Sequence, residues 1–211
     1  PDGVYLVAQI SCCVDELLAS RSSSFALRTD YGANYMDDTG TWLDPYNADV
    51  RNYVVQLTRE LFAMGFDEVV LADVMHPVHK TREGETPMTF LYTREMSAAP
   101  SPINAICGFA LYVANQLEDR PEGKVLSIYL DTPRSLVRYD EGTGQNGVLF
   151  FKIYDRIYYR TDRYTYTYNY SDIESNVTLG SPHDRFVPVV INYLPDNTSW
   201  VYIEDLPETT E

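Results

Sequence analysis

Residues 44–74 read DPYNADVRNYVVQLTRELFAMGFDEVVLADV, and this stretch indicates the fold class. Its first half carries apolar side chains at helical spacing, which predicts a helix with one buried face. These side chains are Val50, Tyr53, Val54, Leu57, Leu61 and Met64. Asp44–Pro45 offers an N-cap and a first-turn proline, Asn47 is a second candidate cap, and Gly65 suits the position after the last turn. Glu68–Val74 (EVVLADV) then predicts a strand that Pro77 ends.

Strand-like and helix-like segments alternate on both sides of this stretch. Before it, Val4–Ile10 (VYLVAQI) is a mostly apolar run, typical of a strand buried on both faces. After it, Ser101–Pro102 repeats the cap-plus-proline signal and predicts a helix over Ile103–Leu117. Further elements are predicted as strands at Val125–Leu130, Arg156–Arg160, Val187–Tyr193 and Trp200–Ile203, and as a short helix over Asn146–Tyr154. The alternation predicts a parallel sheet built from βαβ units, and both an open doubly wound sheet and a (β/α)8 barrel agree with it.

Two long segments interrupt the alternation. Residues 76–101 contain three prolines and mixed charges. We expect a long loop there, over the C-terminal face of the sheet, where barrel loops build ligand sites. Residues 157–170 end in the alternating run Tyr164–Tyr170 (YTYTYNY), which predicts a tyrosine-rich hairpin. That run is interpreted either as a sugar-stacking surface or as an ordinary edge hairpin. Together with these segments, residues 1–211 are expected to form a single domain.

The composition excludes several classes of protein. The chain has 211 residues, of which 45% are hydrophobic and 22% charged, so it can bury a sizeable core. Its formal net charge of −15 argues against nucleic acid as a partner, because nucleic-acid-binding proteins concentrate positive charge. No run reaches the roughly 18–20 apolar residues that a membrane span requires. A neutral or cationic ligand agrees with the charge, and the 18 tyrosines suit polar, ring-shaped ligands such as sugars.

Acidic residues follow several of the predicted strands. Asp73 lies near the end of EVVLADV, Asp131 directly follows VLSIYL, and Asp162 lies beyond the next strand. Ligands of parallel α/β proteins meet the C-terminal ends of the strands, so Asp73 and Asp131 are the candidates for catalysis. Two carboxyl groups across a cleft are what glycoside hydrolysis requires. The alternative is that these aspartates cap turns and helix N-termini.

Other chemistries have little support in the sequence. Asp73, His76 and His79 form the pattern D-x-x-H-x-x-H. Pro77 prevents a regular helix from aligning the three side chains, so we expect no metal site. Neither a G-x-G-x-x-G nor a P-loop pattern is present, and no serine lies in a G-x-S-x-G elbow. We therefore expect no cofactor.

One set of motifs resembles a known family. The set comprises Val4–Ile10, then Thr41–Asn47 (TWLDPYN), then Gly65–Val69 (GFDEV) at the start of a strand that ends in Pro77. In this order and spacing, the motifs resemble the bacterial family called the putative glycosyl hydrolase domain, whose barrel is related to those of α-amylase-like enzymes. The resemblance is strongest over residues 4–77.

The resemblance implies an incomplete (β/α)8 TIM barrel. Gly144–Gln145 and Tyr154–Ile157 extend it more thinly over residues 123–195. It makes Val4–Ile10 the third barrel strand, so strands 3 to 8 are expected in this sequence and the first two are not. Val4–Ile10 would then form an edge that is exposed or covered by a partner. Exposed edges recruit other chains, so a homodimer through this edge is expected.

The resemblance also implies a glycoside hydrolase-like function with an altered site. The family's strand before Pro77 ends in F-D-Y-V-R-F-P, and its aspartate falls on Ala72 here, with Asp73 one position later. Successive strand residues point to opposite faces, so this shift turns the acid away from the cleft. The acid of the next strand, Asp131, is displaced as well. We therefore expect polysaccharide binding with weak or no hydrolysis, and the alternative is a non-catalytic carbohydrate-binding or cell-envelope scaffold domain.

The expected partner is a polysaccharide or an oligosaccharide. We predict that it contacts five side chains, which are Trp42, His76, Tyr129, Tyr159 and Asp162. Because the resembling family is bacterial and handles polysaccharide, we expect an extracellular or cell-envelope location.

Overall fold

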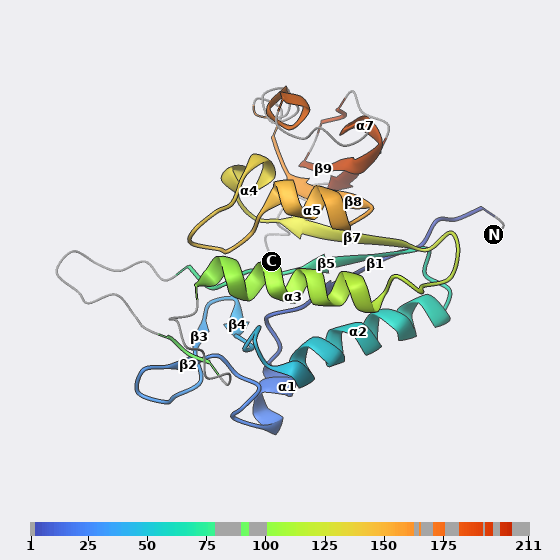
Figure 1. Cartoon of the computed structure of the whole chain (residues 1–211). Helices are drawn as coiled ribbons and strands as arrows, with labels where there is room; N and C mark the ends of the chain where they lie inside the picture. The colour runs from blue at the N-terminus through green and yellow to red at the C-terminus, as the bar shows by residue number, and fades with distance from the viewer. Residues whose placement is uncertain are drawn as a thin grey trace, which may run out of the picture.

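The computed structural model describes residues 3–78, 90–92, 101–162, 165, 171–175, 182–191, 193–195 and 199–203. Its main feature is a six-stranded sheet in the order β1-β5-β7-β8-β9-β10, with every neighbouring pair parallel (Figure 1). The strands are β1 (Val7–Ser11), β5 (Glu68–Ala72), β7 (Val125–Leu130), β8 (Arg156–Arg160), β9 (Phe186–Ile191) and β10 (Val201–Ile203). The sheet curls into a half-barrel, which confirms the prediction of an incomplete (β/α) barrel.

Two long helices, α2 (Ala48–Ala63) and α3 (Pro102–Gln116), lie side by side against the outer face of the sheet (Figure 1). A shorter helix, α5 (Gly147–Ile153), packs against α3 and β8. The main core lies between these helices and the sheet. A smaller cluster lies on the inner face of the half-barrel and consists of Val70, Tyr158, Val187 and Val189, with Tyr129 packed against it. Alternate residues of the central strands therefore face the helices or the interior of the half-barrel.

Local signals set both ends of α2. The side chain of Asn47 caps the helix by accepting hydrogen bonds from two backbone N–H groups of the first turn, at 2.8 and 3.2 Å. The prediction that Asp44 caps this helix is wrong, because its carboxylate accepts from the Tyr46 N–H (2.8 Å) in the turn before the helix. Pro45 therefore precedes the helix as well. At the far end, Gly65 has φ of +105°, the left-handed conformation in which glycine ends helices.

The other long elements lie where the sequence predicts them. Ser101 caps α3 by accepting from the Asn104 N–H (3.2 Å), and Pro102 is the first helical residue. The bounds of β7 and β8 are those predicted, and α5 begins after its N-cap Asn146. The two helices have strong boundary signals, since a capping side chain stands before each of them.

Both edges of the six-stranded sheet are exposed in the described part of the chain. The prediction that Val4–Ile10 is buried on both faces is wrong, because β1 is an edge strand and Val7, Gln9 and Ser11 are exposed. The prediction that this strand forms an exposed edge is confirmed. At the opposite edge, all three residues of β10 are exposed. Exposed large hydrophobic side chains gather at the two edges, and these are Val4, Tyr5, Leu6, Val7, Trp200, Val201, Tyr202 and Ile203.

Short elements connect the strands and helices. They are α1 (Glu16–Arg21), β2 (Arg28–Thr29), β3 (Met36–Asp37), β4 (Gly40–Thr41), β6 (Phe90–Leu91), α4 (Pro133–Val137) and α7 (Pro182–Arg185). β2 pairs with β6 and β3 with β4, both antiparallel. Most of the predicted loop 76–101 lies outside the described residues, so its place over the C-terminal face stays a prediction. Of the predicted tyrosine-rich run Tyr164–Tyr170, the structure describes only Thr165, which lies in a turn.

A buried charge network occupies the N-terminal end of the strands. The Glu68 side chain is fully buried, and its carboxylate accepts hydrogen bonds from Ser127 Oγ (2.5 Å), Arg156 Nη1 (2.7 Å) and Tyr5 OH (3.0 Å). The Tyr158 hydroxyl also donates to it. A buried charge is costly unless it is paired and hydrogen-bonded, and Glu68 meets both conditions.

Candidate active site

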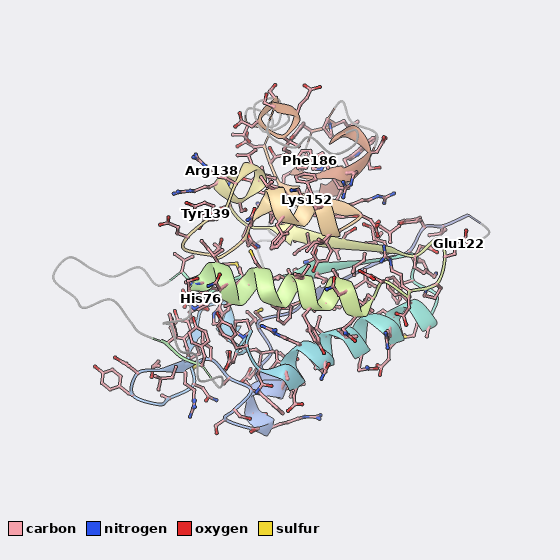
Figure 2. The ribbon with its side chains drawn as sticks, viewed as in Figure 1. His76, Glu122, Arg138, Tyr139, Lys152 and Phe186 are labelled. Atoms are coloured by element: carbon pink, nitrogen blue, oxygen red, sulfur yellow. The ribbon has the colours of Figure 1, made fainter. Side chains whose placement is uncertain are left out.

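A cavity of about 710 Å³ opens at the C-terminal ends of β7 and β8. It is lined by Tyr129, Leu130, Asp131, Pro133, Tyr159, Arg160, Thr161, Asp162, Thr165 and Ile191, and we call it the site cavity. Figure 2 shows His76, Arg138 and Tyr139 at this end of the sheet and Glu122 at the other end. The site cavity thus lies where parallel α/β proteins bind their ligands.

Asp131 is the first residue after β7, and Gln145 holds it at two points. The Asp131 N–H donates to Gln145 Oε1 (3.0 Å), and Gln145 Nε2 donates to Asp131 Oδ2 (2.7 Å). The residue is exposed to solvent in the site cavity, although protein surrounds its carboxyl on most sides. That partial desolvation raises the pKa of Asp131 to about 6, the Gln145 hydrogen bond opposes the rise, and the charge of Asp73 adds to it. A carboxyl that titrates near neutral pH suits a general acid.

Asp73 lies directly after β5 in an uncommon backbone conformation. Its φ of +52° is the one positive value among the described non-glycine residues. Its carbonyl accepts from the Cys13 N–H (3.2 Å), which joins the end of β5 to the end of β1. The alternation of strand side chains therefore ends at Ala72, and alternation alone does not define where Asp73 points. Asp73 raises the pKa of Asp131 through its charge, so the two acids lie within electrostatic range, but Asp73 is not part of the described lining of the site cavity.

Three of the predicted substrate contacts line the site cavity together with Asp131. Tyr129 is half-buried, and burial together with the Asp131 charge raises its pKa to about 12, so its hydroxyl stays a neutral donor. Tyr159 is 8% exposed on β8. Asp162 is exposed, and its carboxylate accepts from the N–H (2.8 Å) and the hydroxyl (3.0 Å) of Thr165. Asp162 thus caps a turn, and its contact with substrate stays a prediction.

The other two predicted contacts, Trp42 and His76, are buried and do not line the site cavity. Trp42 belongs to the main core. The His76 ring packs edge-on against Phe90 (centroids 4.8 Å apart), and its Nε2 hydrogen-bonds to the Tyr92 hydroxyl (2.8 Å). Burial lowers the pKa of His76 to about 4, so the ring is neutral near pH 7. In these contacts, His76 fixes the segment 90–92 beside the end of β5, and its contact with substrate stays a prediction.

Two residues of this region are not among the sequence-predicted ones. Gln145 is fully buried, and its Nε2 also faces the carbonyls of Val74 (3.2 Å) and Tyr129 (3.3 Å), so it joins the ends of β5 and β7. The one signal for Gln145 in the sequence is that Gly144–Gln145 forms part of the family resemblance. Arg160 ends β8 and lines the site cavity. Alternation along RIYYR places it on the same face as Tyr158, which is a signal for a position inside the half-barrel.

The described part of the chain holds neither a cluster of metal ligands nor a membrane-spanning helix. There, no group of three His, Cys, Asp or Glu side chains is arranged to hold a metal ion. His79, the last residue of D-x-x-H-x-x-H, lies outside the described residues. In the same part of the chain, no helix combines the length and the apolar character that crossing a membrane requires.

Comparisons with known proteins agree with this geometry. A family model described as a putative glycosyl hydrolase domain matches residues 1–171. The PgaB (BpsB) glycoside hydrolase domain from Bordetella bronchiseptica is 13% identical with a TM-score of 0.59, and the match covers 95% of this chain and 70% of that one. Aspergillus fumigatus Ega3, in complex with galactosamine, is 14% identical with a TM-score of 0.51 and coverages of 90% and 61%. These two likenesses show a shared fold.

A hypothetical protein from Ruminiclostridium thermocellum ATCC 27405 is 25% identical with a TM-score of 0.45, and the match covers 59% of this chain and 58% of that one. The chain therefore spans 58% to 70% of the length of these three solved structures. None of the curated proteins matches the sequence.

Proposed function

The chain belongs to the putative glycosyl hydrolase domain family, and we propose that it binds a polysaccharide in the site cavity and hydrolyses it weakly or not at all. The observation that carries this proposal is the chemistry of the cavity. Asp131, an acid that titrates near neutral pH, shares it with Tyr129 and Tyr159. Tyrosines offer flat faces and hydroxyls to sugar rings, and an acid with a raised pKa protonates a glycosidic oxygen.

The proposed weakness of hydrolysis follows from the second carboxyl. Glycosidases hold their two carboxyl groups roughly 5–5.5 Å apart when retaining and about 6.5–9.5 Å apart when inverting. The family resemblance assigns the second acid to position 72, where this chain has the buried Ala72. Asp73 is the candidate replacement, because its charge reaches Asp131. It is half-buried and outside the described cavity lining, which supports slow turnover at most.

In the proposed reaction, protonated Asp131 donates its proton to the glycosidic oxygen as the bond to the sugar carbon breaks. A water adds its oxygen to that carbon, and Asp73 accepts the proton that the water loses. With Asp73 misplaced, the second step lacks a base and the site binds sugar without cleaving it. The second candidate function, a carbohydrate-binding or cell-envelope scaffold domain, is favoured by Ala72, which cannot transfer a proton. For both functions we propose an extracellular or cell-envelope location.

The test is release of reducing ends from a panel of neutral and amino-sugar polysaccharides, with binding measured by affinity electrophoresis. The variants are Asp131→Asn and Asp73→Asn, and the control is Asp119→Asn, which alters an acid of the exposed Arg59–Asp119 pair. We expect slow turnover that falls by about 10²–10⁴-fold in Asp131→Asn, with binding retained. Binding without turnover in the unaltered protein would support the scaffold function. If the unaltered protein shows no binding and no turnover, both functions are contradicted.

We also propose that two copies pair through β1. The support is the exposed edge strand and the apolar run Val4–Val7 that leads along it. Light scattering after size-exclusion chromatography is expected to give twice the mass of the 24.1 kDa chain. A charge on the edge, in Val7→Lys, should return the protein to a monomer. A monomer at every concentration of the unaltered chain would contradict the pairing.

A further inference from the structure

Gln145 belongs to a loop, residues 140–146, that is held firmly in place. The Asp140 N–H donates to the Gln145 carbonyl and the Gly144 N–H to the Asp140 carbonyl, both at 2.8 Å. Gly144 has φ of +76°, and a Cβ at this position would lie 2.2 Å from the Pro102 carbonyl oxygen, so only glycine fits against the start of α3. The His76 N–H donates to the Thr143 carbonyl of the loop (2.8 Å). These contacts fix the backbone from which the Gln145 side chain projects.

The orientation of the Gln145 amide is defined by its surroundings. Its Oε1 accepts from the Asp131 N–H, and its Nε2 faces Asp131 Oδ2 and the carbonyl oxygens of Val74 and Tyr129. A flipped amide would place an oxygen against three acceptors and a nitrogen against a donor. The side chain is also fully buried, so water does not compete for these hydrogen bonds.

We propose that Gln145 is the positioning residue for Asp131: its Nε2 donates to Oδ2, so that Oδ1 is the oxygen that carries the transferable proton. This inference rests on the proposed role of Asp131 as the acid. A proton on Oδ2 would meet the Nε2–H directly, so protonation is directed to Oδ1, which accepts no hydrogen bond from the described part of the chain. The same hydrogen bond favours the carboxylate, which keeps the acid from becoming too weak to give up its proton.

The experiment is an NMR titration of the Asp131 carboxyl carbon, whose resonance is identified by its loss in Asp131→Asn. Gln145→Met keeps the length of the side chain and removes its amide. We expect the pKa of Asp131 to rise by about one to two units, which corresponds to the strength of a hydrogen bond to a charged group. The control is Thr143→Val, which removes an acceptor for the Gln145 N–H (3.3 Å) and keeps the amide. An unchanged pKa in Gln145→Met, or an equal rise in Thr143→Val, would overturn the inference.

Gln145→Glu provides a second variant if Gln145→Met does not fold. Its carboxylate repels the Asp131 carboxylate, so the pKa of Asp131 should rise further than in Gln145→Met, and an unchanged value would overturn the inference. The titration needs no turnover, so the positioning role is decided even if the unaltered protein cleaves no glycan and the proposed hydrolysis fails. Where glycan is cleaved, the alkaline limb of the pH–kcat profile should move upward by the same amount as the titration.

Discussion

Glu68 and Asp131 lie at opposite ends of the same half-barrel, in opposite electrostatic surroundings. Glu68 is fully buried, and its carboxylate receives hydrogen bonds from an arginine, a serine and two tyrosines. Asp131 opens to the site cavity, receives one amide hydrogen bond, and has the like charge of Asp73 within range. The first charge is compensated by the groups around it, whereas the second is compensated only in part and titrates near neutral pH. The difference indicates which end of the sheet is built for chemistry.

The largest expected effect concerns Glu68, whose charge is compensated at the N-terminal end of the strands. Arg156→Met leaves the buried Glu68 carboxylate without its cation, and removing one partner of a buried ion pair costs about 3–5 kcal/mol. We therefore expect the free energy of unfolding, measured by urea denaturation, to fall by about this amount at pH 7.

A double variant checks the cause of that loss. Adding Glu68→Leu to Arg156→Met removes the unpaired charge, so a large part of the lost stability should return. If the double variant is less stable than Arg156→Met alone, the loss reflects packing around Arg156, and the contrast between the two ends is wrong.

The two regions also differ in how well the sequence predicts them. The strands and helices follow from apolar periodicity, caps and breakers, which act within a few residues, so β7 and β8 could be bounded correctly. Asp131 could be found because it directly follows a well-bounded strand. The network around Glu68 joins Tyr5, Ser127 and Arg156 across three other segments of the chain, and no local pattern encodes that meeting.

Burial keeps two of the predicted substrate contacts, Trp42 and His76, out of the described lining of the site cavity. Trp42 and His76 resemble ligand contacts by residue type, but Trp42 is buried in the main core, and His76 is covered by the distant residues Phe90 and Tyr92. The positive φ of Asp73 likewise depends on how the ends of β5 and β1 meet, through its carbonyl and the Cys13 N–H. Such features depend on tertiary contacts rather than on spacing.

A smaller effect on stability is expected from Asp131, at the C-terminal end of the strands. The pKa of Asp131 is raised from 3.8 to about 6, so the folded protein binds this proton more tightly than the unfolded chain. Its contribution to stability is fully present below about pH 4 and is lost as the pH rises through about 6. The stability of Asp131→Asn relative to the unaltered protein should therefore increase between pH 4.5 and pH 7 in urea denaturation. Because solvent reaches Asp131 and screens its charge, the direction of this change is the test, and a constant difference would contradict it.

The smallest expected effect comes from a second ion pair at the N-terminal end of the strands, which is more exposed than that of Glu68. Asp155 also pairs with an arginine, with Arg120 Nη2 at 2.5 Å from its Oδ2, but its side chain is 41% exposed, whereas that of Glu68 is 0% exposed. Asp155→Asn removes the charge and keeps an oxygen that can accept from the Leu126 N–H (2.8 Å in the unaltered protein). Exposed pairs contribute about 0.2–1 kcal/mol, so urea denaturation should show a loss of that size, well below that of Arg156→Met. Equal losses in the two variants would mean that burial does not set the strength of these pairs, and the contrast between Glu68 and Asp131 would need another cause.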